Sequence, residues 1–171
     1  MENLSLSASM EDYLEAIFHI VAEKRVARGK DIAASLRVHK SSVTAALRNL
    51  AENKLINYAP YDVVTLTPQG AALAQDVVWR HEALLNFFVQ VLTIEEHLAE
   101  EVACRMEHAL PRLIGDRLIL FCDFLEVCPL TGKKWTLGFQ HFCDGDLTQK
   151  NCEHCLSLCL EDVTKNGLEV G

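Results

Sequence analysis

Two short helical patterns separated by a three-residue turn constrain the fold of this chain more than any other feature. Residues 29–36 and residues 40–53 each place apolar side chains on one side at helical spacing, and residues 37–39 form the turn between them. The outward side of the second segment instead carries basic, hydroxyl and small side chains, namely Lys40, Ser41, Thr44, Ala45 and Arg48. Two short helices joined in this way predict a helix-turn-helix.

A helix before this motif and a β-hairpin after it extend the pattern. Residues 9–23 repeat apolar side chains at helical spacing. Residues 55–58 and 63–66 are β-prone runs, and residues 59–62 between them favour a turn. A hairpin directly after the second helix of the motif is the wing of a winged helix-turn-helix, which we expect over residues 1–67.

The middle of the chain is predicted to be helical. A long helix opened by Pro68 is expected over residues 68–92, and two more are expected over residues 94–110 and 112–126. The first is apolar along most of its length, which favours packing on a partner chain, with burial in the chain's own core as the alternative. We therefore expect a helical dimerisation domain over residues 68–126, and a fold that is mainly α with a small β-hairpin wing.

The charge distribution points to a polyanionic partner for the first part of the chain. The net charge is −8, yet residues 24–54 carry eight basic and two acidic side chains, whereas residues 67–171 carry eight basic and sixteen acidic ones. A local basic patch attracts phosphate whatever the total charge is, although a solvated helical face would have the same composition. We expect double-stranded DNA as the partner. The candidate contacts are Arg28, Lys30, Lys40, Ser41, Ser42, Thr44 and Arg48.

A second set of residues has the spacing of metal ligands. Cys104, Glu107 and His108 occupy positions i, i+3 and i+4 of a predicted helix, so a thiolate, a carboxylate and an imidazole share one face. An ordinary polar helix surface would produce the same triplet, so the spacing alone leaves both interpretations open.

Three further candidates lie earlier in the chain. Asp12 and Glu15 are three residues apart on the first predicted helix and are neighbours on its surface. His81 lies midway along the long helix predicted over residues 68–92. A single histidine on a helix is more often structural than a ligand, so His81 by itself would not indicate a metal site.

Four stretches of the sequence, in this order and spacing, are typical of one protein family. They are residues 9–15 (SMEDYLE), residues 31–44 (from DIA to HKSSVT), the pair Arg80-His81, and residues 103–108 (ACRMEH). Together they resemble the iron-dependent repressor family, with its iron-responsive DtxR and IdeR branch and its manganese-responsive MntR branch. The resemblance covers about residues 5–125. It implies a winged helix-turn-helix followed by a helical dimerisation domain, with a cation held between them.

The resemblance also implies a set of ligands that mixes the two branches. Cys104 matches an iron-branch ligand where the manganese branch has Glu, whereas Asp12 and Glu15 match manganese-branch ligands. One thiolate and two imidazoles favour Fe²⁺, Co²⁺, Ni²⁺ or Zn²⁺, whereas the carboxylates favour Mn²⁺. We expect Fe²⁺ as the activating metal because of Cys104, with Mn²⁺ as the alternative. Leu85 and Glu100 stand where the iron branch has ligands of an ancillary site. The complete implied set is Asp12, Glu15, His81, Cys104, Glu107 and His108.

The placement of these ligands implies a function. Asp12 and Glu15 belong to the predicted DNA-binding domain, whereas the other four belong to the dimerisation domain. A cation bound by both would set the separation of the two recognition helices in a homodimer, to match half-sites about 34 Å apart on a palindromic operator. The resemblance therefore implies a metal-activated transcriptional repressor that controls metal homeostasis.

Cysteines crowd the last part of the chain, which is expected to be an irregular tail over residues 127–171. Cys152 and Cys155 have the spacing of a metal knuckle, and Cys128 and Cys143 could complete four thiolates, with Cys159 and His154 as alternative members. In a reducing cytosol such a cluster favours a metal over disulfides. We expect a structural Zn²⁺ site, with an iron–sulfur cluster or buried thiols as the alternatives.

Two other functions are compatible with the sequence. A DNA-binding regulator could sense redox state or an iron–sulfur cluster through the tail cysteines. A metal-handling protein or metalloenzyme could use the same ligands, but the sequence offers no convincing nucleophile–base pair and no phosphate-binding glycine loop, so no enzymatic activity is expected. No secretory signal and no apolar run of about 20 residues occur, so we expect a cytoplasmic protein without a membrane partner.

Overall fold

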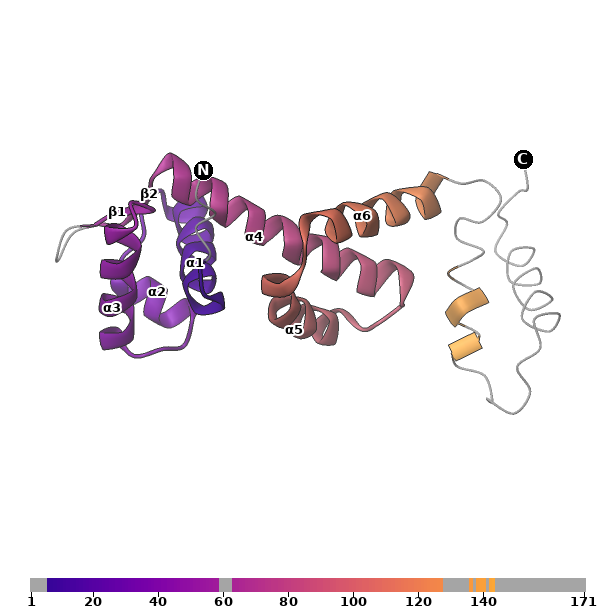
Figure 1. The fold of residues 1–171 in the computed structure, drawn as a ribbon. Helices are drawn as coiled ribbons and strands as arrows, with labels where there is room; N and C mark the ends of the chain where they lie inside the picture. The colour runs from indigo at the N-terminus through magenta and orange to yellow at the C-terminus, as the bar shows by residue number, and fades with distance from the viewer. Residues whose placement is uncertain (1–5, 59–62, 128–135, 137, 141, 144–171) are drawn as a thin grey trace. The chain divides into compact units, whose positions relative to one another are not determined.

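Figure 1 shows the fold in a computed structural model, which describes residues 6–58, 63–127, 136, 138–140 and 142–143. The chain divides into two compact units, the first comprising Met1–Arg80 and the second beginning at His81. Each unit has a hydrophobic core of its own. One helix continues through the boundary and contributes to both units, and the domain limits predicted after residues 67 and 126 stay predictions.

The first unit is a three-helix motif followed by a hairpin. Its elements in chain order are α1 (Ala8–Lys24), α2 (Gly29–Ser35), α3 (Lys40–Glu52), β1 (Ile56–Asn57), β2 (Thr65–Leu66) and the first part of α4 (Pro68–Asn86). The three helices agree with their predicted ranges to within one residue at each end. The prediction of a winged helix-turn-helix is confirmed.

Apolar side chains of the three helices meet in one core. Leu14 and Ile17 of α1, Ile32 of α2, and Leu47 and Leu50 of α3 are almost completely buried. Because each helix is apolar on one side only, that side must pack on the other two helices. Burial of each such side chain contributes about 1.5–3 kcal/mol relative to leaving it exposed. This packing leaves the opposite side of α3 in contact with solvent.

The hairpin is short and is joined to the helices by an additional bridge. β1 and β2 pair in antiparallel register, with Ile56 opposite Leu66. Ala27, between α1 and α2, forms an antiparallel bridge with Val64, through N–O distances of 3.0 and 2.8 Å. The turn predicted over residues 59–62 lies outside the described residues.

The start of α4 packs directly on the residue that precedes β1. The hydroxyl of Thr67 accepts a hydrogen bond from the N–H of Gly70 at 3.1 Å and donates to the carbonyl of Leu55 at 3.1 Å. Gly70 lies so close to Leu55 that a Cβ atom at position 70 would overlap the Leu55 carbonyl oxygen. The absence of a side chain at Gly70 therefore allows α4 to leave the hairpin at this angle.

Within residues 81–127, the second unit is mainly helical. Its elements are the end of α4, a π-helical turn η1 (Phe87–Val91), α5 (Glu96–Met106), a 3₁₀ turn η2 (Glu107–Ala109) and α6 (Arg112–Val127). Leu84, Phe88, Ala99 and Ala103 form the centre of its core. The prediction of a mainly helical chain with one small hairpin is confirmed for the described residues. None of the described helices is both long enough and apolar enough to cross a membrane.

α4 is shorter as an α-helix than the range of residues 68–92 that was predicted. It ends at Asn86, and the π-helical turn follows. Ala74, Val77 and Leu84 on α4 are buried within this single chain. For these positions the structure favours the alternative of burial in the chain's own core over packing on a partner.

The helix predicted over residues 94–110 is α-helical only as far as Met106. In the 3₁₀ turn that follows, the N–H of Leu110 bonds to the carbonyl of Glu107 at 3.2 Å. Pro111 explains this ending, because proline disfavours the α conformation in the residue before it and has no N–H to continue the helix.

α6 carries an apolar face in contact with solvent. The exposed fractions are 67% for Leu113, 56% for Leu120, 49% for Phe124 and 77% for Val127. Their spacing of three, four and seven residues puts them on one side of the helix, whereas Leu125 is buried on another side. A contiguous exposed apolar face of this kind marks an interaction surface.

The tail cysteines fall mostly outside the described residues. Cys143 is described and is exposed. Cys128, Cys152 and Cys155 lie outside the described residues. The second metal site that was predicted from these four residues stays a prediction.

Candidate functional site

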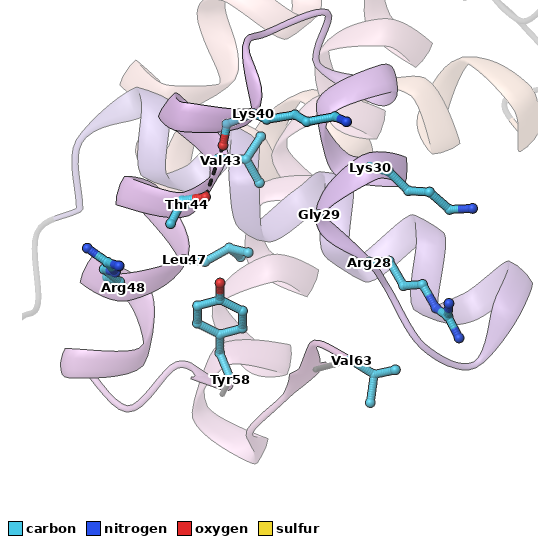
Figure 2. A pocket seen from close by; sticks show the side chains of 10 residues that line it. All are labelled: Arg28, Gly29, Lys30, Lys40, Val43, Thr44, Leu47, Arg48, Tyr58 and Val63. Carbon is cyan, nitrogen blue, oxygen red and sulfur yellow. Dashed lines mark hydrogen bonds between the residues drawn. The ribbon is translucent and has the colours of Figure 1, made fainter. Parts of the chain in front are cut away.

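An open groove with basic walls lies between α2, α3 and the hairpin of the first unit (Figure 2). Its volume is about 550 Å³, and four of the residues that line it are basic whereas none is acidic. These four are Arg28, Lys30, Lys40 and Arg48, all of which the sequence had singled out as DNA contacts. A concave surface with this charge attracts a phosphate backbone.

α3 presents its predicted contacts outward, beside this groove. Lys40, Ser41, Ser42 and Arg48 are exposed, and Thr44 is partly buried. The Thr44 hydroxyl donates to the Lys40 carbonyl at 3.0 Å (Figure 2). Because this bond uses the hydroxyl proton of Thr44, the methyl group is the part of the side chain suited to contact a base.

Tyr58 is a groove residue that the sequence analysis missed. Figure 2 shows its ring at the hairpin side of the groove, with the hydroxyl directed toward Leu47 of α3. A phenolic hydroxyl can donate a hydrogen bond to a phosphate oxygen without adding charge. The signal that could have found Tyr58 is an aromatic donor at the end of the β-prone run over residues 55–58.

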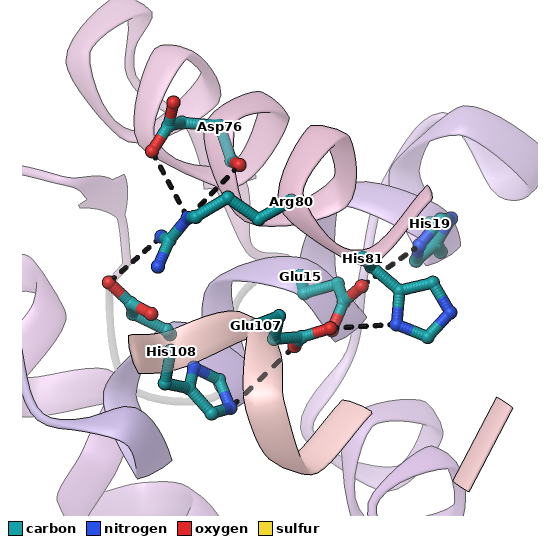
Figure 3. Close-up of polar contacts among 8 residues, drawn as sticks. Glu15, His19, Asp76, Arg80, His81, Glu107 and His108 are labelled. Carbon is teal, nitrogen blue, oxygen red and sulfur yellow. Dashed lines mark hydrogen bonds and ion pairs between the residues drawn. The ribbon is translucent and has the colours of Figure 1, made fainter. Parts of the chain in front are cut away.

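A buried carboxylate forms the centre of a second candidate site, in the second unit. Glu107 in η2 is completely buried, and its carboxylate has an imidazole near each oxygen (Figure 3). His81 Nδ1 lies 2.7 Å from Glu107 Oε2, and His108 Nε2 lies 3.6 Å from Glu107 Oε1. A buried charge is retained only where opposite charges or donors compensate it. The structure therefore brings three of the six predicted ligands together.

His81 has a second carboxylate partner that the sequence analysis did not include in the ligand set. His81 Nε2 lies 3.3 Å from Glu100 Oε2, and the Glu100 side chain is 59% exposed. Glu100 lies on α5 and Glu107 in the 3₁₀ turn η2 that follows it, and both carboxylates contact the His81 ring. The signal for Glu100 in the sequence was its place where the iron branch has an ancillary-site ligand.

These carboxylates keep the His81 ring protonated. The hydrogen bond to Glu107 is the largest cause that raises the pKa of His81, and the bond to Glu100 raises it further. Burial of the ring lowers this pKa and so opposes both bonds. Together they raise the pKa of His81 from 6.5 to about 9. At neutral pH both ring nitrogens therefore donate, and the charge of the ring compensates the buried carboxylate.

The donor set around His81 fits a divalent cation of the first transition row. Imidazole nitrogen and carboxylate oxygen are ligands of Mn²⁺, Fe²⁺ and Zn²⁺. A divalent cation would compensate the charge of Glu107 as the protonated ring does. The chemistry of these residues is therefore consistent with the metal that the sequence resemblance implied.

The other predicted ligands lie on α5 and α1. Cys104 is exposed, one turn before the buried Glu107, and the helix type changes between the two. The spacing argument that grouped them assumed one continuous α-helix. Asp12 and Glu15 lie on α1 in the first unit and are partly buried, with Glu15 Oε1 3.7 Å from His19 Nε2. The roles of Cys104, Asp12 and Glu15 as ligands stay predictions.

Two family profiles match the chain in sequence order. The profile described as the iron dependent repressor N-terminal DNA binding domain matches residues 5–64. The profile described as the iron dependent repressor metal binding and dimerisation domain matches residues 67–136. The basic groove lies within the first match, and the contacts of Glu107 lie within the second.

Curated relatives show the same similarity. The HTH-type transcriptional regulator MntR of Bacillus subtilis is 37% identical over 118 residues, which cover 69% of this chain and 82% of the relative. An uncharacterized HTH-type transcriptional regulator of Methanocaldococcus jannaschii is 35% identical over 119 residues, which cover 69% of this chain and 95% of the relative.

Solved structures are also similar to the chain. IdeR of T. acidophilum matches with a TM-score of 0.60 and 27% identity, over 65% of this chain and 52% of that one. A manganese-dependent transcriptional repressor in complex with manganese matches with a TM-score of 0.60 and 28% identity, over 67% of this chain and 53% of that one. The chain therefore spans about half the length of these solved structures.

Proposed function

Because the chain belongs to the iron-dependent repressor family, we propose that it is a metal-activated transcriptional repressor that binds operator DNA as a homodimer and controls metal homeostasis in the cytoplasm. One observation carries the metal dependence: the buried Glu107 carboxylate lies between two imidazoles, inside the part that matches a metal binding and dimerisation domain. The relatives are named as transcriptional regulators, which supports a regulator rather than an enzyme.

The proposed activating metal is Fe²⁺, with Mn²⁺ as the alternative. A thiolate ligand from Cys104 would favour Fe²⁺, whereas the carboxylate of Glu100 beside His81 adds an oxygen donor that suits Mn²⁺. A relative named MntR supports the same alternative. The proposed ligands are Asp12, Glu15, His81, Cys104, Glu107 and His108.

Ligands in two parts of the chain would make DNA binding depend on the metal. A divalent cation would be bound both by carboxylates on α1 and by side chains of the second unit. Asp12 and Glu15 belong to α1, which packs on α2 and α3 in the first unit. Restricting α1 would therefore restrict α3, and with it the spacing of the two α3 helices in a homodimer. A palindromic operator requires a spacing of about 34 Å or a multiple of it, so the restricted population is the one that binds.

α3 and the basic groove are the proposed DNA contacts. Basic side chains would contact phosphates or guanine edges, the serines would contact phosphates, and the Thr44 methyl would meet a thymine methyl. Tyr58 would add a neutral donor at the hairpin side of the groove. The proposed contacts from the sequence are Arg28, Lys30, Lys40, Ser41, Ser42, Thr44 and Arg48.

The exposed face of α6 is the proposed contact between the two chains of the dimer. Leu120 and Phe124 lie near its middle and are about half exposed in one chain. The surrounding residues match a domain described as the dimerisation domain. A second copy of this chain would bury the apolar face, which is the main source of free energy in association.

The decisive experiment is anaerobic fluorescence anisotropy with DNA from upstream of the protein's own gene. The protein is titrated in Fe²⁺, Mn²⁺, Zn²⁺ or a chelator. Tight, salt-sensitive binding in the presence of one metal and weak binding in chelator is the expected result, and it identifies the metal. Equal affinity in chelator would refute metal activation and would favour the alternative in which the tail cysteines are the sensor.

A structural Zn²⁺ site is proposed for the tail, with an iron–sulfur cluster as the alternative. The support is the Cys152–Cys155 spacing, with Cys128 and Cys143 as further thiolates. Metal analysis of the purified protein is expected to find zinc that is lost in a Cys152→Ser, Cys155→Ser variant. Visible absorbance of an iron–sulfur cluster would contradict the zinc site. A zinc content that is the same in the variant and in wild type would contradict it as well.

A further inference from the structure

Arg80 is a buried cation in the first unit to which the proposed function assigns no role. It is 9% exposed and directly precedes His81 on α4. Its Nη2 lies 3.1 Å from Glu11 Oε1 on α1, and its Nε lies 3.3 Å from Asp76 Oδ2 one turn earlier on α4. A guanidinium stays charged when it is buried, so its position depends on carboxylates of this kind.

Arg80 contacts Asp76 on its own helix and Glu11 on a different helix. Asp76 and Arg80 are four residues apart on α4, and Arg80 Nε also donates to the Asp76 backbone carbonyl at 3.3 Å. Figure 3 shows the Arg80 side chain held at Asp76 in this way. These contacts orient the guanidinium without linking one helix to another. The contact with Glu11 is different, because it joins α4 to α1 across 69 residues of sequence.

The residues of this ion pair are next to two proposed ligands. Asp12 follows Glu11 on α1, and His81 follows Arg80 on α4. We propose that Arg80 is a positioning residue: its ion pair with Glu11 holds α1 against α4 before any cation binds, and so fixes the backbone from which Asp12 and His81 are presented. This inference rests on the proposed function, because it assumes that these two residues are ligands.

Loss of the ion pair would act on the ligands through the helices. Without the ion pair, α1 and α4 can move relative to one another within the first unit. Cation binding must then also restore their contact, which makes the net free energy of binding less favourable. Groups that orient metal ligands typically change metal affinity by about 10–100-fold when they are removed. Arg80 acts on the ligands through the helix backbone and does not contact them in this proposal, so we expect a loss of metal affinity of about tenfold.

The test compares two variants that each remove one carboxylate charge from Arg80. Glu11→Gln weakens the contact between α1 and α4, whereas the control Asp76→Asn weakens the contact of Arg80 within α4. Calorimetric titration of the full chain with Mn²⁺ is expected to show an affinity about tenfold lower for Glu11→Gln, and close to wild type for Asp76→Asn. Amide exchange in chelator is expected to be faster in α1 for Glu11→Gln only.

A further variant separates positioning from general stability. Arg80→Lys keeps the charge but not the planar fork that can contact both carboxylates, so it is expected to resemble Glu11→Gln. DNA affinity in chelator is expected to equal that of wild type in all three variants, because the groove and α3 are unchanged.

The possible failures of this inference and of the proposed function are distinguishable. Wild-type Mn²⁺ affinity in folded Glu11→Gln would overturn the positioning role and leave metal activation intact. Equal losses in Glu11→Gln and Asp76→Asn would also overturn it, because the contact between helices would then have no special effect. A wild-type chain that binds no divalent cation would overturn both.

Discussion

In the proposed metal site, protons and a divalent cation would compete for the nitrogen atoms of His81. The contact with Glu107 raises the pKa of His81 to about 9, so the ring is charged at neutral pH. A nitrogen that ligates a metal cannot carry a proton, so metal binding at this ring releases a proton and strengthens as pH rises. This competition is a property of the two residues and their immediate contacts, and it can be tested at that scale.

We predict that His81 stabilises the metal-free fold at low pH and loses that effect at high pH. Its pKa is higher in the folded chain than the ordinary value of 6.5. The stabilisation is therefore complete below pH 6.5 and disappears as pH rises through about 9. Urea unfolding of wild type and His81→Gln in chelator would show a difference in free energy that narrows over this range. A difference independent of pH would contradict the role of the charged ring.

At the scale of elements, close packing at the start of α4 restricts one position to glycine. Gly70 meets the Leu55 carbonyl directly, whereas the nearest atom to a Cβ at Gly29, at the start of α2, would be Val43 Cγ1 at 3.9 Å. The two glycines are therefore a matched pair, one crowded by backbone and one with space for a methyl group.

Gly70→Ala is predicted to destabilise the protein by about 2–3 kcal/mol, because the helix and the segment before β1 must move apart to admit the methyl group. Gly29→Ala is predicted to change stability by no more than about 0.5 kcal/mol. Urea unfolding in chelator measures both values. Equal effects of the two substitutions would show that the contact with Leu55 is unimportant.

The groove between α3 and the hairpin predicts two kinds of effect on DNA affinity. Lys40→Ala should lower affinity and reduce the slope of log affinity against log salt by about one, since one phosphate contact is lost. Tyr58→Phe should lose about 1 kcal/mol of binding at an unchanged slope, because its hydroxyl is neutral. Anisotropy titrations at several salt concentrations measure both.

Lys24→Gln is the control for these two variants, because Lys24 lies on α1 in the same unit and pairs with Asp31 at 3.8 Å. It is expected to change the affinity and the salt slope less than Lys40→Ala does. Affinities of Lys40→Ala and Tyr58→Phe equal to wild type would place the DNA on another surface.

At the scale of the whole molecule, the proposed repression requires two chains, in keeping with the match to a domain described as a dimerisation domain. The apolar side chains of α6 are exposed in one chain, and their burial by a second copy is what the proposed dimer requires. On α4, by contrast, Ala74, Val77, Ala83 and Leu84 are buried within the chain itself. The dimer contact proposed here lies on α6, whereas the sequence analysis favoured the long helix over residues 68–92, whose packing on a partner chain stays a prediction.

Phe124→Asp is predicted to convert the dimer to a monomer, because a carboxylate in an apolar contact loses its hydration without a compensating partner. Sedimentation velocity measures the change, and operator affinity should fall with it. Asp123→Asn, one position away on α6, is the control and should remain dimeric. A dimeric Phe124→Asp variant would exclude this face as the contact.

Much of the fold could be predicted from the sequence because it depends on local periodicity. The apolar spacing of α1, α2 and α3, the β-prone runs of the hairpin and the basic outward side of α3 all lie within short segments. Each of these features follows from the 3.6-residue repeat of a helix or the two-residue repeat of a strand, together with the burial of one apolar side. The sequence also marked Glu107, His108 and His81, because their spacing resembles that of a known family.

Tertiary structure alone decided which of these residues meet. Glu107 reaches His81 across 26 residues of sequence, and Arg80 reaches Glu11 across 69. Such contacts depend on how separate helices pack against one another, and the periodicity within one helix does not specify that packing. For the same reason the sequence analysis left Glu100 out of the ligand set and missed Tyr58, and it placed Cys104 on one face with a residue that a change of helix type buries. The sequence by itself determined the elements and their chemistry, whereas packing determined the burial of Glu107 and with it the charge of His81.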